Sequence, residues 1–385
     1  MPSTHRPPHG RTPARVNAPA AGTLRTRTLR TRSPRAAPPR REPPGRVHRS
    51  HPQRAVLARG GTPAPLRLRA AGLVLGLAAD SLIGDPRRHH PVAWFGSWAQ
   101  CVEARTYGDS RGQGVVHVVA TLVPVIALGV GADALNRARP RAGILLTALA
   151  TWACLGARSL AREGERMADA LASDDLAGAR QRLPHLCGRD PAALDAGELG
   201  RATVESLAEN TADSAVATLW WGSVAGVPGM LLHRAINTLD AMVGHRSPRY
   251  RRFGTAAARL DDALDWIPAR LTGALACALA PTVGGSTWNT ARIWLRDARD
   301  HPSPNGGWCE AAWAGALGVR LGGENVYAGR VETRGTLGER DGPRPDADAV
   351  RAAARLVTRV TVCAALALTA TLLMIDEFSP GRKHP

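Results

Sequence analysis

The sequence predicts an all-α, polytopic integral membrane protein with a basic N-terminal tail. Two observations carry this prediction: several long segments contain no charged side chain, and the positive charge is concentrated at the start of the chain. The net charge is +18, but residues 1–59 hold fourteen arginines and one acid, which is +13 of that total. The rest of the chain is close to neutral. Its charge therefore argues against a nucleic-acid-binding protein.

Residues 1–66 are predicted to be a disordered tail. Its first part combines eleven prolines with the arginines and shows no apolar periodicity, so it buries too little apolar surface to offset the entropy of ordering. No apolar stretch follows until Ala70, which argues against a secretory signal. Contact with anionic lipid headgroups, or a translation start near residues 56–66, are open alternatives. The membrane domain is expected over residues 67–376, before a short tail at 377–385.

Five uncharged segments predict the helices of this domain. In chain order they are Val115–Ala132, Ala142–Ala157, Ala215–Leu232, Leu271–Trp288 and Val360–Ile375. A helix that crosses a bilayer needs about 20 apolar residues, with a range of roughly 17–25. Each segment is therefore short for a crossing, but together they are too many for one soluble core. A soluble helical protein with buried hairpins is the alternative.

An earlier apolar segment, Leu66–Ile83, contains Asp80. A carboxylate at membrane depth is costly and usually functional, so we expect this helix to open onto a polar site. The orientation stays open. Three arginines in residues 137–141 favour a cytoplasmic loop. If every segment crosses once, residues 158–214 then lie outside.

The first polar cluster directly follows this helix. Gly84-Asp85-Pro86 comes first, and His90-Pro91 begins the next stretch. A proline disfavours a helical conformation of the residue before it, so the helix ends here. Asp85 and His90 are candidate site residues, and a helix stop with a capping aspartate is the alternative.

Glu205, Glu209 and Asp213 are spaced by four residues, just before the segment that starts at Ala215. On an α-helix a step of four turns the side chain by only about 40°, so the three carboxylates share one face. Like charges at this spacing repel unless a cation lies opposite. Mg²⁺ binds one or two carboxylates and completes its shell with water and phosphate oxygens. The spacing predicts a Mg²⁺ site, and a solvated acidic face is the alternative.

Further polar residues follow in two groups. Asn237 and Asp240 lie three residues apart on one helical face. The run 259–270 then places Asp261, Asp262 and Asp265 between Arg259 and Arg270, which can pair with these carboxylates or with phosphate. An arginine–carboxylate ladder that orients helices is the alternative.

A glycine-rich stretch at residues 304–323, which includes Asn305, lets backbone N–H groups approach an anion. It lacks the order GxxxxGK[ST], and the chain's only lysine is Lys383, so a P-loop is excluded. Six scattered cysteines without CxxC spacing argue against a zinc site or a disulfide framework.

At these residues the sequence resembles the CobD/CbiB family of cobalamin biosynthesis, the adenosylcobinamide-phosphate synthases. The resemblance covers about residues 70–330. Its strings are DSLIGDPRRHHPVAWFG, GRD, VESLAENTADSAVA, RAINTLDAMVGHR, YRRFGTAAARLDDALDWIPARLT and PNGGWCEAAWAGALGVRLGGENVYAG. The chain departs from the family pattern at Ser214, Asp265, Cys309 and Glu324.

The resemblance implies a multi-pass enzyme of the cell membrane that joins a corrin carboxylate to an amine. Adenosylcobyric acid would be coupled to (R)-1-amino-2-propanol or its O-phosphate with hydrolysis of ATP, and Mg²⁺ would assist. Membrane lipid is an expected partner, and association with other corrinoid-pathway enzymes is compatible with this role. Glu205, Glu209 and Asp213 are assigned to Mg²⁺–ATP, and Arg259 and Arg270 to phosphate.

Asp261 or Asp262 is the expected base that keeps the amine neutral, and Glu209 and Asp240 complete the catalytic set. The residues expected to bind substrate or ATP are Asp80, Asp85, His90, Arg189, Asp190, Asn210, Asn237, Arg259, Arg270 and Asn305.

Two other classes of function fit parts of the sequence. The run DDALD matches the DDxxD pattern of prenyl-diphosphate enzymes, but these need two facing motifs and only one occurs here. A corrinoid transporter or binding module without catalysis would suit Asp80 and the broken apolar segments. ATP consumption that depends on cobyric acid would separate this class from the enzyme.

Overall fold

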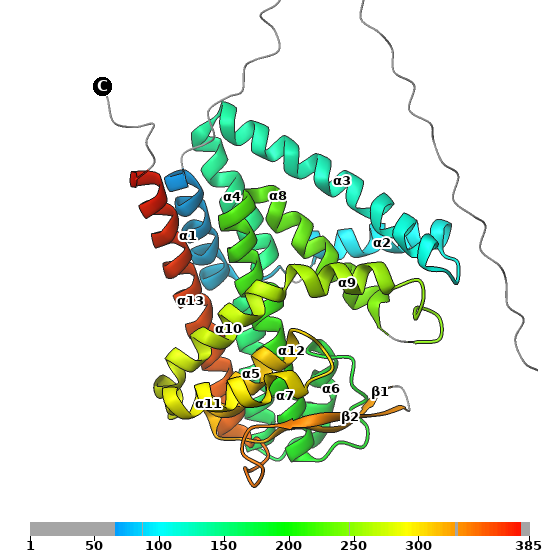
Figure 1. Ribbon diagram of the computed structural model, residues 1–385, viewed down its shortest axis with the longest axis vertical. Coiled ribbons are helices and arrows are strands. Elements are labelled where there is room, and N and C mark those ends of the chain that lie inside the picture. Colours follow the sequence, from blue (N-terminus) through cyan, green and yellow to red (C-terminus); the bar gives the residue numbers. More distant parts are fainter. Residues whose placement is uncertain (1–65, 87, 246, 328–329, 379–385) are drawn as a thin grey trace, which may run out of the picture. The chain divides into compact units, whose positions relative to one another are not determined.

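The structure is a computed structural model that describes residues 66–378, apart from residues 87, 246 and 328–329 and the side chains of 324–333 (Figure 1). Almost all of each predicted terminal tail lies outside these residues. The described chain is mostly helical, which confirms the all-α prediction. Its sheet is a single antiparallel pair of strands near the C-terminal third of the chain.

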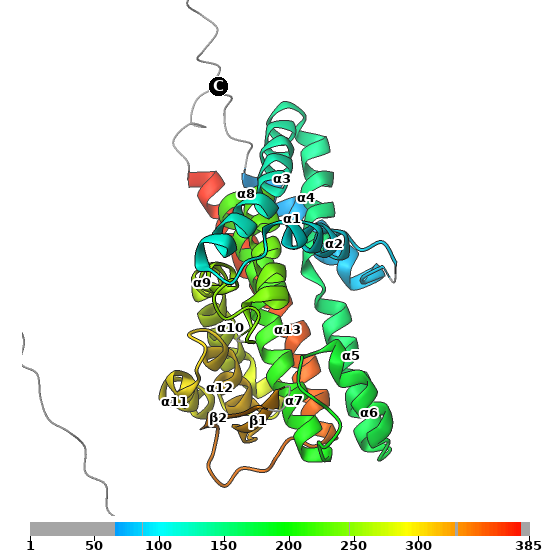
Figure 2. The ribbon, with the colours of Figure 1, turned by 90° about the vertical axis from the view of Figure 1, so that its right-hand side faces the viewer.

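Two groups of elements meet in the molecule. The apolar end contains α1 (Leu66–Ile83), α2 (Pro91–Thr106), α3 (Arg111–Ala138), α4 (Pro140–Leu155), α8 (Ala217–Leu239) and α9 (Thr255–Leu264). The polar end contains α5 (Ala157–Ala172), α6 (Leu176–Arg182), α7 (Ala196–Asn210), α10 (Trp266–Leu279), α11 (Thr287–Asp297), α12 (Gly306–Leu317), β1 (Leu321–Tyr327) and β2 (Arg330–Leu337). The helix α13 (Ala347–Phe378) runs through both ends (Figure 2).

Four helical stretches are long and apolar enough to cross a membrane, by length and composition: 111–138, 140–172, 196–244 and 347–378. Large apolar side chains stay exposed on them, with Leu128, Leu145 and Leu366 between 64 and 69% exposed. Apolar surface of this extent is costly in water but not in lipid. These observations support the prediction of an integral membrane protein.

The helix α8 is a hairpin, although the sequence predicted one straight segment. Gly226 breaks it with φ +66° and ψ −153°, a conformation that favours glycine. A Cβ on Gly222 would lie 2.9 Å from the sulfur of Met230, eight residues later, so the two limbs, 217–225 and 227–239, fold back on each other. Figure 1 shows the chain rising from α7 and then descending to α9. Arg69 caps the tip by donating to the carbonyl oxygens of Ser223 (2.9 Å) and Val224 (3.3 Å).

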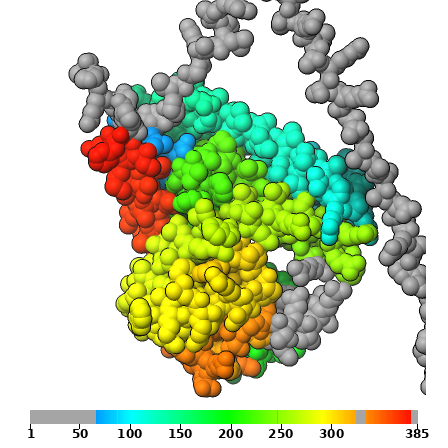
Figure 3. All heavy atoms as spheres, viewed as in Figure 1, coloured from blue at the N-terminus to red at the C-terminus, as the bar shows by residue number. Residues whose placement is uncertain are grey.

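A separate core holds the second limb of α8 against α2, α3 and α9. Phe253 and Leu239 are buried in it beside Ile236 and Val118. These helices form the arm at the right of Figure 1, and Figure 3 shows it set apart from the rounded body that α10–α12 form. Packing in this core therefore positions the end of the second limb of α8 and the helix α9 relative to each other.

The polar end has the largest core, which is built around Trp313 of α12 and Leu207 of α7. The uncharged segment Leu271–Trp288, which Pro281 and two glycines interrupt, is divided in the structure. The helix α10 ends at Leu279, a 3-10 turn covers Ala280–Val283 and α11 begins at Thr287. Pro281, which removes a backbone donor, lies in that turn.

Candidate active site

The two open ends of the α8 hairpin each carry a π-helical turn and an aspartate. Asp213 lies in the turn Thr211–Val216 before the first limb, and Asp240 begins the turn Asp240–Gly244 after the second limb. π turns with i→i+5 hydrogen bonds are rare and occur frequently at functional sites. Asp213 and Asp240, 27 positions apart in sequence, therefore both lie at the open end of the hairpin.

The helix α9 and the residue that follows it add three more carboxylates. We term the five side chains together the aspartate cluster: Asp213, Asp240, Asp261, Asp262 and Asp265. Their charges act on one another across the cluster. Burial, reinforced by Asp265 and Asp240, raises the pKa of Asp261 to about 9. Three of the four residues that we predicted to be catalytic are thus in one place.

Amide and imidazole groups border the aspartate cluster. Asn237 donates through Nδ2 to Oδ1 of Asp261 at 3.3 Å, and Nε2 of His233 lies 2.7 Å from Oδ1 of Asp265, with both side chains buried. Asn237, which we predicted to bind substrate or ATP, therefore lies at the edge of the aspartate cluster. His233 was not predicted, because a lone histidine in an apolar stretch gives no signal of its own.

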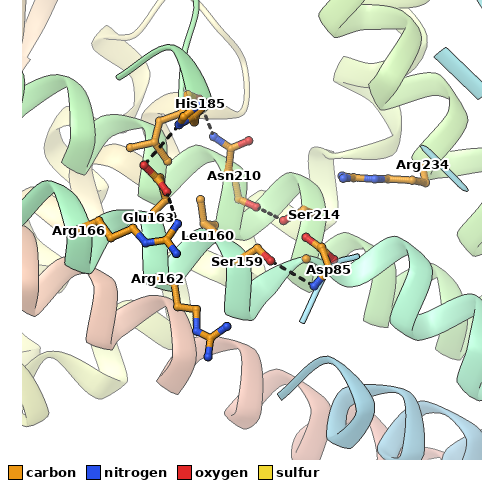
Figure 4. A pocket seen from close by; sticks show the side chains of 12 residues that line it. Asp85, Ser159, Leu160, Arg162, Glu163, Arg166, His185, Asn210, Ser214 and Arg234 are labelled. Carbon is orange, nitrogen blue, oxygen red and sulfur yellow. Dashed lines mark hydrogen bonds and ion pairs between the residues drawn. The ribbon is translucent and has the colours of Figure 1, made fainter. Parts of the chain in front are cut away.

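A cavity of about 410 Å³ is lined by Asp85, Ser159, Asn210, Ser214 and Arg234, among other residues (Figure 4). Although burial acts to raise it, hydrogen bonds from the side chains of His90 and Ser159 hold the pKa of Asp85 below its usual range. Two predicted binding residues, Asp85 and Asn210, therefore line one cavity.

His90 and Asp80 support this cavity from outside its lining. Nδ1 of His90 accepts from the backbone of Val92 and caps α2, and its Nε2 lies 3.5 Å from Asp85. Asp80 is 1% exposed, and its Oδ2 accepts from the backbone N–H of Arg158 at the start of α5. Part of the first polar cluster is therefore structural: α1 ends before Gly84, and the side chain of His90 caps α2.

The α5 side of the cavity was missed in the sequence. Glu163 is held by Arg166 at 3.1 Å, by Arg182 at 2.9 Å and by His185 at 3.5 Å (Figure 4). Arg162 is the other charged side chain of α5 in the lining. The sequence does contain a signal for these residues: the uncharged stretch that ends at Ala157 changes abruptly to the charged sequence AREGER, residues 161–166.

The predicted metal face of α7 is corrected by the structure. Glu205 pairs with Arg189 at 2.5 Å, and accepts from the backbone N–H of Gly322 at 2.9 Å. Arg189, which we predicted to bind substrate or ATP, instead forms a buried ion pair with Glu205. Asp213 lies beyond the start of the π turn, which breaks the 3.6-residue periodicity, and the charges of Asp265 and Asp261 act on it as well as that of Glu209. Among the described residues, Glu205, Glu209 and Asp213 are not a set whose ligand atoms all lie within 4.8 Å of one another.

Glu209 has different neighbours. Glu209, His301 and Glu310 each offer one ligand atom, and these atoms lie within 4.8 Å of one another. In the part of the chain that the structure describes, no other set of three histidine, cysteine, aspartate or glutamate side chains comes as close. Burial, followed by the charge of Glu205, raises the pKa of Glu310 to about 8. Neither His301 nor Glu310 was predicted, because their positions carry no spacing pattern.

Arg270 and Asn305, both predicted to bind ATP, are hydrogen-bonded to each other at 2.7 Å. The guanidinium of Arg270 lies 4.5 Å from the ring centre of Trp266 and 4.9 Å from that of Trp308. These three side chains, together with His301, line a second cavity of about 500 Å³. The remaining predicted residues, Asp190 and Arg259, are exposed and line neither cavity.

Comparisons with known proteins agree on one family. A family model described as "CobD/Cbib protein" matches residues 73–357. A protein named "Cobalamin biosynthesis protein CobD" from Mycobacterium tuberculosis (strain H37Rv) is 49% identical over 306 residues, which is 79% of this chain and 96% of the relative. Proteins of the same name from Geobacter metallireducens and Rhodobacter capsulatus are 43% identical (74% of this chain, 92% of the relative) and 41% identical (72% and 89%). No solved structure matches the chain.

Proposed function

Because this chain belongs to the CobD/Cbib family of cobalamin biosynthesis proteins, we propose that it catalyses the ATP-dependent formation of an amide bond. The carboxylate of adenosylcobyric acid is joined to the amino group of (R)-1-amino-2-propanol or of its O-phosphate. The observation that carries this proposal is the aspartate cluster, which five carboxylates from three elements form beside an arginine-lined cavity.

The aspartate cluster fits Mg²⁺ by its chemistry. It offers only oxygen donors. Burial, with the charges of Asp265 and Asp240, raises the pKa of Asp261, and a cation would stabilise these carboxylates in their charged form. Asp213 and Asp240, at the two ends of the hairpin, are the residues that would hold the ion. Mg²⁺-bound ATP supplies the phosphoryl group that activates the corrin carboxylate.

The cavity beside the cluster provides groups for the amine substrate. Asp85 stays charged, because its pKa is low, and it binds an ammonium group. Asn210 and Ser214 offer hydrogen bonds in the same lining, and Arg234 offers positive charge for an anionic group. The cavity thus binds and orients a small polar amine.

Asp261 is the residue that we assign as the base. In the ligand-free protein it holds a proton at neutral pH, since its pKa is about 9. A cation among the neighbouring carboxylates stabilises the charged form, so Asp261 becomes able to accept the proton of the attacking amine. Asn237, which donates to Asp261, orients this carboxylate.

The test is conversion of adenosylcobyric acid by the detergent-purified protein with ATP, Mg²⁺ and each of the two amines, followed by mass spectrometry. We expect an amide product that requires ATP. Asp240→Asn should lower turnover by roughly 10²-fold or more, the scale of losing one well-placed electrostatic group. Asp109→Asn, on an exposed residue outside the cluster, is the matched control. Tight corrinoid binding without amide formation or ATP consumption would identify a binding protein instead.

A further inference from the structure

A second group of titratable side chains shares no residue with the aspartate cluster, although the charge of its Glu209 acts on Asp213. Glu209 is at the end of α7, His301 follows the 3-10 turn Ala298–Asp300, and Glu310 is in the middle of α12. Three separate elements thus deliver one ligand atom each to a region less than 4.8 Å across. We call these three residues the Glu–His–Glu site.

Glu310 is the feature that calls for a ligand. Its side chain is completely buried, and among the described residues neither carboxylate oxygen accepts a hydrogen bond of good geometry from an N–H group. The carboxyl group of Glu209 is the neighbour that can share a proton with it. Its charged neighbours are Nε2 of His301 at 3.3 Å, the guanidinium of Arg334 at 3.6 Å and the carboxyl group of Glu209. A buried carboxylate without hydrogen-bond donors is strongly destabilised unless a cation or a proton compensates it. The oxygens of Glu310 are therefore available to an ion.

The spacing of the donor atoms suits direct coordination. Two ligands of a tetrahedral ion with bonds of about 2.0–2.1 Å lie about 3.3 Å apart, which equals the distance from Nε2 of His301 to Oε1 of Glu310. The remaining separations need to shorten by at most about 1.5 Å to reach the same geometry. Gly306 preserves this space, because a Cβ there would lie 2.4 Å from Oε1 of Glu209.

The donor set distinguishes this site from the aspartate cluster. Mg²⁺ prefers oxygen ligands and keeps several waters, whereas an imidazole with carboxylates suits Zn²⁺, Fe²⁺ or Mn²⁺. From these observations we propose that Glu209, His301 and Glu310 bind one divalent first-row transition-metal ion. His301 also lines the cavity of about 500 Å³, so one ligand of the site borders a space that water or a small molecule can enter.

Binding of the ion displaces two neighbours. Nδ1 of His301 accepts from the N–H of Ser303 at 3.1 Å, and its Nε2 faces both Glu310 and the guanidinium of Arg334. An ion bound at Nε2 leaves Nδ1 to carry the ring proton, so the contact with Ser303 opens. Arg334, 3.1 Å from Nε2, also moves aside. Metal binding is thus coupled to the loop before α12 and to β2.

The test is metal binding by the full chain, purified in detergent and stripped with a chelator. Titration with Zn²⁺ or Mn²⁺, followed by calorimetry, should show one ion per chain that an excess of Mg²⁺ does not displace. Glu310→Gln should weaken binding by at least about tenfold. Asp240→Asn, which removes a carboxylate of the aspartate cluster, should leave the affinity unchanged. Absence of a one-to-one complex, or equal weakening by both substitutions, would overturn the proposal.

Two further measurements keep the test independent of folding and of the proposed reaction. The extended X-ray absorption fine structure of zinc in the wild-type complex should show scattering from one imidazole. A spectrum without imidazole scattering would also overturn the proposal. Thermal unfolding without metal shows whether Glu310→Gln is folded. If it is not, His301→Gln replaces it in the titration. No assay here uses ATP or a corrinoid, so failure of the metal site leaves the amide-ligation proposal to its own experiment.

Discussion

Glu205 and Glu209 lie four residues apart on α7, yet the structure predicts opposite effects on stability when each is changed to glutamine. The side chain of Glu205 is 3% exposed and its partner Arg189 is also 3% exposed. Glu205→Gln removes the carboxylate charge that faces that guanidinium and lies 3.8 Å from Arg201. Removing one partner of a buried ion pair costs about 3–5 kcal/mol.

Glu209→Gln instead removes a charge that faces another carboxylate. Glu310 and Glu205 both act on Glu209 as like charges, so the neutral side chain should keep or raise the free energy of unfolding. The substitution should also lower turnover by roughly 10²-fold or more if Glu209 has the catalytic role we expect from the family resemblance.

The assay is thermal unfolding of both variants in detergent with a chelator present, so that no ion contributes. At about 2–4 °C per kcal/mol, Glu205→Gln should lower the melting temperature by roughly 6–20 °C, while Glu209→Gln should not lower it. A double variant with Arg189→Met and Glu205→Gln removes both charges and should recover part of the loss. Equal destabilisation by both single substitutions would refute this account of α7.

Three other outcomes follow from the fold and the sequence. The chain should be found in the membrane fraction and need detergent, and recovery of folded, active protein without detergent would contradict the membrane assignment. Deleting residues 1–59 should leave turnover unchanged, because the family match begins at residue 73; a well-expressed but inactive truncation would show that the tail contributes. Asp261 has a pKa of about 9 when folded, above the usual value of about 3.9, so the folded state binds the extra proton and its stability falls as the pH rises through this window. Asp261→Asn should therefore melt at a higher temperature than the wild type at pH 9 and approach it at low pH, whereas parallel melting curves would refute the raised pKa.

Most of the helices could be predicted because their signal is local. An uncharged stretch of sixteen or more residues needs no tertiary information, and α3, α4 and α13 were found in this way. The break at Gly226 could not be predicted, since a single glycine in an apolar segment is common and only packing against Arg69 and α3 selects the bent form.

The candidate site was predictable where its residues are close in sequence, as for Asp261 and Asp262, which the sequence named together. The contacts of Asp261 with Asn237 and of Arg270 with Asn305 join residues far apart in sequence and were not predicted. The predicted metal face assumed an unbroken α-helix from Glu205 to Asp213, whereas the π turn that begins at Thr211 ends the regular spacing before Asp213. The partner of Glu205 is Arg189, in a loop whose position depends on the whole polar end, and no pattern in the sequence encodes it.

The hairpin at Gly226 also predicts the membrane topology of the chain. A segment that enters and leaves on the same face makes no net crossing, so it does not change the sidedness of the helices after it. The loop before α7, with Cys187, and the loop between α8 and α9 are then open to the same aqueous compartment. A membrane-impermeant thiol reagent that reaches Cys187 therefore also reaches a cysteine placed at Ser247. Counting apolar stretches alone would put these two sites on opposite faces.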